Sequence, residues 1–472
     1  MKMRILVILL AVILVLLVAV AFVITNYQFI NGSFYAKDLE SLDLSGKPLK
    51  DLDGLSGMSQ LQRLDLRNTQ ITPEEYEAVQ AQLPDCEILW LLPFQGKYLP
   101  LDTTALTLTS LKTEEIPLLA YLPQLKTVDA TACPDHDALL ALQKAYPNCA
   151  VRYSVPLDGQ KWPENTTVMD LSAATPEALD QALSYLGAVT QVTIQQPIDD
   201  APAMLVLKEK YPDIAFTYSF RLLDKTVSTK DTFLDLSGVS LKDTAALEAA
   251  LPHFDKLEKV DMCGCGLSDD AMSALNKAHP DTLFVWEVYF GENAVRTDIT
   301  YFMPYQLHYK ITDKDADTLK HLTQLLCLDL GHMEISRSDY LQYMTKMKYL
   351  LLGQTPITDI SGCANMPDLI YAELFMTEIK DFSPLTACKK LEDLNVCFTK
   401  PTDPSVFCQM PQLKSLWFRG NYDKAVYNQL KQGLPNTNIA FDPGTATEGG
   451  WRKLQNYYDM RDLLGMPYME AS

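Results

Sequence analysis

Hydrophobic residues recur with a fixed period of 22 along residues 325–421. Five segments there share the pattern Leu-x-x-Leu-x-Leu-x-x-(Asn or Thr)-x-Ile, or a close variant of it. They begin at Leu325, Met347, Leu369, Leu391 and Leu413, so that every step, such as 347−325 or 413−391, is 22 residues. Within each segment the Leu-x-Leu core alternates apolar and variable positions, which predicts a short strand with one buried face.

A fixed period in the low twenties with this pattern is typical of a leucine-rich-repeat solenoid, in which neighbouring repeats stack to share one core. The chain resembles the leucine-rich-repeat family, most closely the short-repeat, internalin-like type found on bacterial surfaces. The resemblance implies that the Asn-or-Thr position turns inward and satisfies backbone groups at the bend. That position holds Thr355, Thr377, Thr399 and Asn421. The resemblance also implies a long binding surface, and repeat proteins of this kind rarely carry catalytic machinery.

The same pattern occurs near the N-terminus, where repeats start at Leu39 and Leu61, again 61−39 or 22 residues apart. A helix is expected directly after them. Thr72 as N-cap and Glu75 three residues later form a capping box, and the helix is expected to run to about Leu83.

A longer period governs the middle of the chain. Pro followed by Asp or Asn recurs at spacings of 63, 65 and 68, at Pro84, Pro147, Pro212 and Pro280. Each is followed by a β-branched and aromatic stretch that predicts one strand: Cys86–Leu92, Cys149–Val155, Ile214–Phe220 and Thr282–Phe290. A turn is expected after each, near Gly96, Gly159, Asp224 and Gly291. The middle therefore consists of larger modules, each combining repeat strands, a helix and an added excursion.

These patterns predict an α/β fold. It is a leucine-rich-repeat solenoid with a parallel concave sheet and convex helices or turns, preceded by one N-terminal transmembrane helix. The expected domains are residues 1–26, a cytoplasmic stub and membrane anchor; 27–310, the longer modules; 311–442, the regular 22-residue repeats; and 443–472, a C-terminal cap. The last segment is too apolar for a free tail, and exposed terminal repeats need covering.

An apolar run of 20 residues, Ile5 to Ile24, follows Lys2 and Arg4. It is long enough to cross a bilayer, and the basic flank favours a single-pass anchor with a cytoplasmic N-terminus and an extracytoplasmic bulk. A cleaved signal peptide is the alternative, because Ala19-Val20-Ala21 resembles a cleavage site. The net charge of −20 argues against nucleic acid as a partner, since phosphates require basic patches.

The search for chemistry-bearing motifs favours no catalysis, no cofactor and no metal. The spacing of the six histidines matches no metal motif, and the ten cysteines occupy repeat positions that favour buried free thiols over disulfides. Asp313-x-Asp315-x-Asp317 opens like a calcium loop, but Thr318 and Gln324 replace its required Gly and Glu. A capping box between Thr312 and Asp315 is the preferred interpretation of that stretch.

The open face of the predicted strands carries the candidate binding residues. An acidic ladder is expected to offer a site for a cationic ligand or basic peptide, or simply a solvated face: Asp43, Asp65, Asp129, Asp170, Asp235, Asp261 and Asp329. Towards the C-terminus the same face becomes aromatic, with Tyr349, Leu351, Tyr371, Glu373, Phe375, Asp393, Trp417 and Arg419. This aromatic set either binds a protein, a peptide or a glycan, or is covered by the C-terminal segment.

The sequence thus favours a membrane-anchored, extracytoplasmic binding protein with a protein or peptide partner on the concave face and the membrane at residues 5–24. A structural protein of the cell envelope is the alternative. A polysaccharide-acting enzyme is a remote alternative, because hydrolysis of a glycosidic bond needs two carboxyl groups at a defined spacing, one of them with a raised pKa. An evenly spaced ladder offers no such preferred pair.

Overall fold

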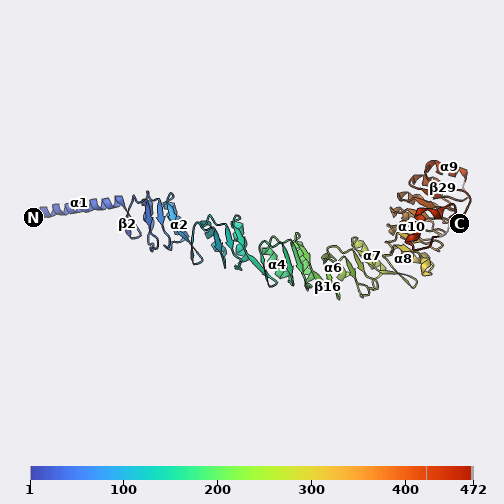
Figure 1. The fold of residues 1–472 in the computed structure, drawn as a ribbon, viewed down its shortest axis with the longest axis horizontal. Helices are drawn as coiled ribbons and strands as arrows, with labels where there is room; N and C mark the ends of the chain where they lie inside the picture. Colours follow the sequence, from blue (N-terminus) through green and yellow to red (C-terminus); the bar gives the residue numbers. More distant parts are fainter. Residues whose placement is uncertain (1, 421–422, 469–472) are drawn as a thin grey trace. The chain divides into compact units, whose positions relative to one another are not determined.

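The computed structural model describes residues 2–420 and 423–468 (Figure 1). The chain divides into two compact units, Met1–Phe220 and Arg221–Ser472, and each is treated by itself. Asn421, expected at an inward repeat position, lies outside the described residues. The predicted domain boundaries after residues 310 and 442 stay predictions.

The first unit alternates short helices with short strands. Its helices are α1 (Lys2–Asn26), α2 (Pro73–Gln82), α3 (His136–Ala145), α4 (Pro176–Tyr185) and α5 (Ala201–Lys210). Its repeat strands are β3 (Ser41–Asp43), β4 (Arg63–Asp65), β5 (Glu87–Leu89), β8 (Ala105–Thr107), β9 (Thr127–Asp129), β10 (Ala150–Arg152), β13 (Val168–Leu171), β14 (Gln191–Ile194) and β15 (Ala215–Thr217). Its hairpin strands are β1 (Tyr27–Ile30), β2 (Ser33–Ala36), β6 (Leu91–Phe94), β7 (Lys97–Pro100), β11 (Ser154–Leu157) and β12 (Gln160–Pro163).

The repeat strands of this unit form three separate parallel sheets, β3-β4-β5, β8-β9-β10 and β13-β14-β15. In the first sheet Leu42, Leu64 and Ile88 are register partners, and all three are buried. The residues on either side of each point the other way, as strand geometry requires. One face of every sheet therefore builds the core, and the other is the open, concave face.

An antiparallel hairpin follows the third strand of each sheet, which corrects one expectation. The stretch Cys86–Leu92 is not a single strand, because β5 ends at Leu89 and β6 begins at Leu91. Trp90 between them is buried and stacks on Tyr76, with ring centroids 4.3 Å apart. Tyr153 holds the same place between β10 and β11 and is also buried. A buried aromatic side chain at the bend thus turns the chain from sheet into hairpin.

The second unit begins with the same arrangement and then changes. Its helices are α6 (Ala245–Ala250), α7 (Asp269–Ala278), α8 (Ala316–Leu319), α9 (Lys424–Gly433) and α10 (Gln455–Leu463). A three-stranded sheet, β18 (Phe233–Asp235), β19 (Lys259–Asp261) and β20 (Leu283–Val285), is followed by the hairpin β21 (Glu287–Phe290) and β22 (Asn293–Arg296). The hairpin β16 (Ser219–Leu222) and β17 (Lys225–Ser228) lies where the two units meet in sequence.

A continuous seven-stranded parallel sheet then forms from the regular repeats. Its strands in order are β23 (Tyr301–Phe302), β24 (Cys327–Asp329), β25 (Tyr349–Leu351), β26 (Tyr371–Glu373), β27 (Asp393–Asn395), β28 (Ser415–Trp417) and β29 (Asn438–Ala440). From β24 to β28 each register partner is 22 residues on, as in Leu350↔Ala372 and Leu394↔Leu416. The convex side is made of short 3-10 helices, among them η7 (Ser361–Asn365), η8 (Ser383–Ala387) and η9 (Pro404–Gln409).

The inward Thr position behaves as the resemblance implies. The Oγ1 hydroxyls of Thr355, Thr377 and Thr399 are buried and donate to the carbonyl oxygen three residues earlier, at 2.7, 2.8 and 2.7 Å. Thr69 in the first unit makes the same bond at 2.5 Å. A buried carbonyl left without a partner costs about 1–3 kcal/mol, so this hydroxyl stabilises the bend of each repeat.

Both predicted capping boxes form. The Glu75 N–H donates to Thr72 Oγ1 and the Thr72 N–H donates to the Glu75 carboxylate, at 3.2 and 2.8 Å. At Thr312 and Asp315 the box opens a 3-10 turn that continues into α8. The Asp313 carboxylate accepts hydrogen bonds from the backbone of Ser336 and Arg337, so it has a structural role in the repeat.

The N-terminal helix α1 contains one candidate membrane span, Met3–Asn26, with none of it buried against the protein. By length and composition it can cross a bilayer, and a signal sequence would pass the same test.

The ten cysteines all lie in described positions as free thiols, and Cys86 and Cys408 alone are partly exposed.

Candidate binding surface

The open faces of the three-stranded sheets are accessible to solvent. Asp43, Asp129, Asp170 and Asp235 are exposed, and Asp65 and Asp261 are partly exposed. Each lies on a strand at the position that faces away from the core. These faces meet the first requirement of a binding surface, which is that a partner can reach them.

Six of the seven ladder aspartates have the same local hydrogen bond. The carboxylate accepts from the backbone N–H two residues on, where the chain leaves the strand. The bonds are Ser45 to Asp43, Arg67 to Asp65, Thr131 to Asp129, Ser237 to Asp235, Cys263 to Asp261 and Gly331 to Asp329. Asn395 accepts the equivalent bond from Cys397 at 3.2 Å, so an amide oxygen serves as well as a carboxylate. The aspartates therefore have a structural role in addition to their charge.

These hydrogen bonds hold the exposed carboxylates ionised. Bonds from Ser45 lower the pKa of Asp43, and bonds from Ser237 lower the pKa of Asp235. The Arg67 guanidinium lowers the pKa of Asp65 through paired hydrogen bonds. Burial opposes ionisation of Asp261, yet hydrogen bonds from Cys263 and Arg296 lower its pKa overall. The open faces thus carry ionised carboxylates at neutral pH, of which Asp65 and Asp261 are in ion pairs with Arg67 and Arg296.

The seven aspartates, all in the described part of the chain, do not form the continuous ladder that the sequence suggests. Two pairs among them are register partners on neighbouring strands, Asp43↔Asp65 and Asp235↔Asp261. Asp129 has Thr107 and Arg152 as its register neighbours instead. The hairpins interrupt the sheet after every third strand up to β20, so six of these aspartates fall on separate small sheets, and Asp329 lies on the seven-stranded sheet.

The open face of the seven-stranded sheet has a different environment, because the C-terminal segment, residues 443–468, lies across it. Trp451 is fully buried and packs on Tyr371 and Trp417, with ring centroids 4.9 and 5.2 Å apart. Tyr457 and Met460 of α10 (Figure 1), and Leu464 directly after it, pack into the same cluster as the strand residues. The central strands of this sheet are therefore buried on both faces, whereas Tyr301 of β23 and Asn438 of β29, at its two edges, are exposed.

Polar side chains of the sheet bind the main chain of that segment. The Asn395 amide donates to the Ala446 carbonyl at 2.9 Å, and the Trp417 indole N–H donates to the Glu448 carbonyl at 2.8 Å. Arg419 donates to the Thr445 carbonyl at 3.4 Å. A Cβ on Gly444 would stand 1.8 Å from the Arg419 guanidinium, so the segment passes close to this side chain. The sheet face recognises an extended backbone as well as aromatic rings.

The pKa values of three carboxyl groups under or beside the segment are raised, whereas those of Asp43 and Asp235 on the open faces are lowered. Burial raises the pKa of Glu373, although Tyr371 OH and the Trp451 indole donate to its carboxylate. Burial likewise raises the pKa of Asp393, which accepts from the Asn456 amide at 2.8 Å, and the pKa of Asp329. Their negative charge is disfavoured while the segment is in place.

The structure brings the predicted aromatic set together, but as interior. Seven of its members have relative exposures of 0–9%: Tyr349, Leu351, Tyr371, Phe375, Asp393, Trp417 and Arg419. Glu373 is partly buried. Of the two alternatives for this face, an accessible patch or a covered one, the structure has the covered one. Any role in ligand binding for these residues requires the segment to leave.

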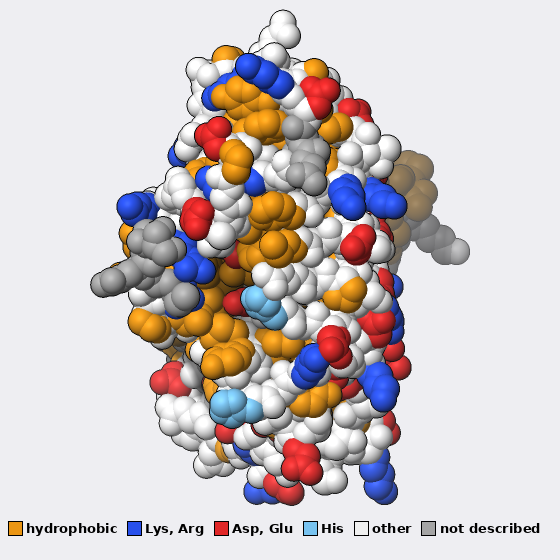
Figure 2. All heavy atoms as spheres, turned by 90° about the vertical axis from the view of Figure 1, so that its right-hand side faces the viewer, with side chains coloured by type: hydrophobic (Ala, Val, Ile, Leu, Met, Phe, Trp, Pro, Cys, Tyr) orange, Lys and Arg blue, Asp and Glu red, His pale blue; other side chains and the backbone are white. Residues whose placement is uncertain are grey.

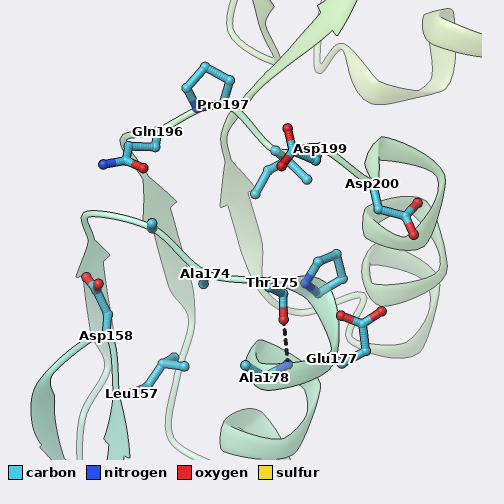
Figure 3. Close-up of a pocket in the computed structure, with 13 residues that line it drawn as sticks. Leu157, Asp158, Ala174, Thr175, Glu177, Ala178, Gln196, Pro197, Asp199 and Asp200 are labelled. Carbon is cyan, nitrogen blue, oxygen red and sulfur yellow. Dashed lines mark hydrogen bonds between the residues drawn. The ribbon is translucent and has the colours of Figure 1, made fainter.

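A hollow of about 510 Å³ lies in the first unit, beside the starts of α4 and α5 (Figure 3). Asp158, Glu177, Asp199 and Asp200 give it an acidic lining. Two of these carboxylates already accept hydrogen bonds from the backbone. Asp200 accepts from the Ala203 N–H and Asp158 from the Ser172 N–H. We therefore regard the hollow as a junction between loops and helix caps.

No group of three or more metal-ligating side chains occurs within residues 2–420 and 423–468. Acid–base hydrolysis would need an accessible carboxyl group with a raised pKa beside an ionised one. Here hydrogen bonds lower the pKa values of Asp43, Asp129 and Asp235. The carboxyl groups with raised pKa values, Glu373, Asp393 and Asp329, lie under or beside the segment.

The surface is mixed in character. Figure 2 shows one face of the molecule, on which hydrophobic side chains lie between acidic and basic ones.

Sequence reasoning missed residues that define these surfaces. Asn456, which bonds to Asp393, carries no sequence signal, because a polar residue in a tail has no assigned direction. The hairpin at Asn31-Gly32 could have been found. Both residues have positive φ, 48° and 79°, and Asn-Gly between β-prone residues is a strong hairpin signal.

Comparison with known proteins gives likeness at the level of the fold. No protein-family model matches the sequence, and no curated protein matches it. Among solved structures, an internalin from Listeria monocytogenes is 15% identical, with 91% of this chain and 88% of that one covered and a TM-score of 0.23. Internalin C2 from the same species is 16% identical over 54% and 77%, with a TM-score of 0.21. A leucine-rich-repeat protein of Leptospira interrogans is 14% identical over 85% and 96%, with a TM-score of 0.27.

At these scores the assignment rests on the strand period and parallel register of this structure. They define a leucine-rich-repeat solenoid of parallel strands and helices, with one apolar helix at the N-terminus that is a signal sequence or an anchor. Solenoids of this class typically bind other macromolecules on their concave surface and are usually not catalysts.

Proposed function

We propose that this chain is a membrane-anchored, extracytoplasmic leucine-rich-repeat protein that binds a basic protein segment. The anchor is α1, and the binding surface is the open face of the three-stranded sheets. The observation that carries the proposal is the exposure of ionised aspartates on these faces, held in place by hydrogen bonds from the next turn. A rigid, pre-positioned charge loses little freedom when a partner binds.

The test replaces charge without disturbing the turn. In the structure Asn395 accepts the same backbone bond as the aspartates, so Asp→Asn keeps the acceptor. The test variant combines Asp43→Asn, Asp129→Asn and Asp235→Asn. The full chain in detergent micelles or vesicles is titrated with oligolysine at low and physiological salt, and we expect binding to weaken roughly tenfold or more.

A matched control carries the same charge change elsewhere. Asp359, Asp381 and Asp403 also accept a backbone N–H two residues on, but they stand at the starts of η7, η8 and η9, outside the strands. Replacing all three with Asn should change oligolysine binding little. Equal loss in both triple variants would mean that only net charge matters, and this would contradict the proposed surface.

A second binding surface is suggested by the contacts of the C-terminal segment. Asn395 and Trp417 bind main-chain carbonyls of that segment, which is how a surface holds a peptide of another protein. We propose that a partner peptide competes for this face. Trp451→Ala should then increase capture of proteins from envelope and secreted extracts. No capture by the parent or by this variant would favour the structural envelope role.

A further inference from the structure

The hairpin that directly follows the N-terminal helix exposes an aromatic pair. Phe29 and Phe34 are register partners on β1 and β2, and their rings meet edge to face at 5.0 Å. They are 48% and 60% exposed, and Tyr27 is 37% exposed. Single exposed aromatic side chains are ordinary, but a contiguous apolar pair of this kind is typical of a contact surface.

The hairpin is fixed to the end of α1 by several contacts. β1 begins at Tyr27, the residue after the helix ends at Asn26. The Lys37 backbone N–H donates to the Asn26 carbonyl at 2.9 Å, and its ammonium donates to the Ile24 carbonyl at 2.7 Å. The Phe22 and Tyr27 rings lie 6.4 Å apart. The hairpin therefore keeps its place at the point where the helix ends.

The other face of the hairpin packs on the first repeat. Ile30 is fully buried, and a Cβ on Gly54 would stand 2.3 Å from the Phe29 carbonyl oxygen. A Cβ on Gly57 would stand 2.3 Å from the Gln28 side chain. This close packing against η1 (Asp53–Gly57) holds one face inward and the aromatic pair outward.

The later hairpins provide an internal comparison. The positions of Phe29 and Phe34 are taken by Pro93 and Tyr98 in β6-β7, by Pro156 and Lys161 in β11-β12, and by Tyr289 and Ala294 in β21-β22. The segment Tyr27–Ala36 contains no charged residue, whereas each of these three later hairpins contains at least one. The phenylalanine pair belongs to the hairpin next to the apolar helix.

We infer that the β1-β2 hairpin inserts Phe29 and Phe34 into the interfacial layer of the membrane that α1 spans. The inference rests on the proposed anchor. Aromatic side chains at the ends of membrane helices favour the headgroup region, and an uncharged hairpin can enter it. Because the hairpin is packed on η1, its insertion would also fix the orientation of the first repeat at the membrane surface.

The test uses the full chain in phosphatidylcholine–phosphatidylglycerol vesicles with brominated acyl chains, which quench tryptophan on contact. Phe29→Trp is compared with Tyr289→Trp, the same strand position in β21-β22, where Tyr289 is 58% exposed. The emission of the parent's native tryptophans is subtracted from each. We expect bromination to reduce the added emission of Phe29→Trp roughly by half and to leave that of Tyr289→Trp unchanged.

The outcomes separate the inference from the anchor on which it rests. Vesicle flotation after an alkaline wash reports the anchor alone. If the Phe29→Trp chain floats and its added indole is not quenched, the hairpin insertion is overturned and the anchor stands. An added indole that is blue-shifted but not quenched would overturn the insertion too, and would assign the aromatic pair to a protein contact. A chain that does not float would overturn both.

Discussion

The sheet β3-β4-β5 and the seven-stranded sheet are built from the same repeat, yet they differ on the concave side. In the first, Asp43 is exposed and ionised, held by hydrogen bonds from the next turn. In the second, Tyr371 and Trp417 are buried beneath Trp451, and the pKa of Glu373 is raised. Both regions have the same inward threonine at the bend after the strand, Thr69 in the first and Thr377 in the second. The difference shows that a repeat specifies its core, while the open-face residues decide whether that face remains a surface.

The largest expected effect comes from removing the side chain that closes the covered face. Trp451→Ala deletes a fully buried indole that contacts Tyr371 and Trp417. We expect the second unit to lose about 3–5 kcal/mol of unfolding free energy, as for other buried Trp→Ala changes. Urea denaturation followed by far-ultraviolet circular dichroism measures it. The control is Tyr289→Ala at a 58% exposed position, expected to cost less than about 0.5 kcal/mol.

Thiol labelling of the same variant shows whether the face opens locally. Cys327 and Cys397 are fully buried within the cluster that Trp451 closes, whereas Cys363 and Cys388 are buried elsewhere, at the convex 3-10 helices. Trp451→Ala should accelerate labelling of the first two and leave the second two protected. Equal acceleration of all four would indicate global unfolding, and the segment would then be part of one cooperative core.

A smaller effect tests what the two regions share. Thr377→Val and Thr69→Val each remove a buried hydroxyl that donates to the carbonyl three residues earlier. Each should cost about 1–3 kcal/mol, because the carbonyl loses its partner inside the core. Similar losses of unfolding free energy would mean that the two regions differ only at their open faces. A much larger loss at Thr377 would mean that the core of the covered sheet differs as well.

The pH dependence should have opposite sign in the two regions. Burial raises the pKa of Glu373, so its favourable contribution is complete below the unfolded-state pKa and is lost as pH rises through the folded-state value. Glu373→Gln should therefore gain stability relative to the parent as pH rises from acid to neutral. The pKa of Asp43 is lowered, so its contribution exists above the unfolded-state pKa and is lost on acidification.

Asp43→Asn should accordingly be less stable than the parent at neutral pH and equal to it in acid. Parallel urea titrations across the pH range measure both variants. For each variant, the difference in unfolding free energy from the parent is plotted against pH. If the two plots had slopes of the same sign, this would contradict the assignment of Glu373 to a buried face and Asp43 to an exposed one.

The repeat period could be read from the sequence because a 22-residue spacing of leucines has one physical explanation, a stack of parallel strands sharing a core. The capping boxes at Thr72 and Thr312 follow from local chemistry and were equally predictable. The bend at Trp90 was not, because an aromatic residue inside a β-prone stretch resembles any strand residue. The covering of Trp417 depends on a contact with Glu448, 31 residues away, and composition alone left both alternatives open.

The interruption of the early sheets has a consequence for how such a chain can change its length. Each three-stranded sheet ends at its third strand, and the following hairpin separates that edge from the next sheet. A gene duplication that copies one whole module, of 63 to 68 residues, would therefore add a sheet with its own hairpin and leave the pairing of the others intact. In the seven-stranded sheet, a duplication would have to extend the C-terminal segment as well, since the new strand would lengthen the face that this segment covers.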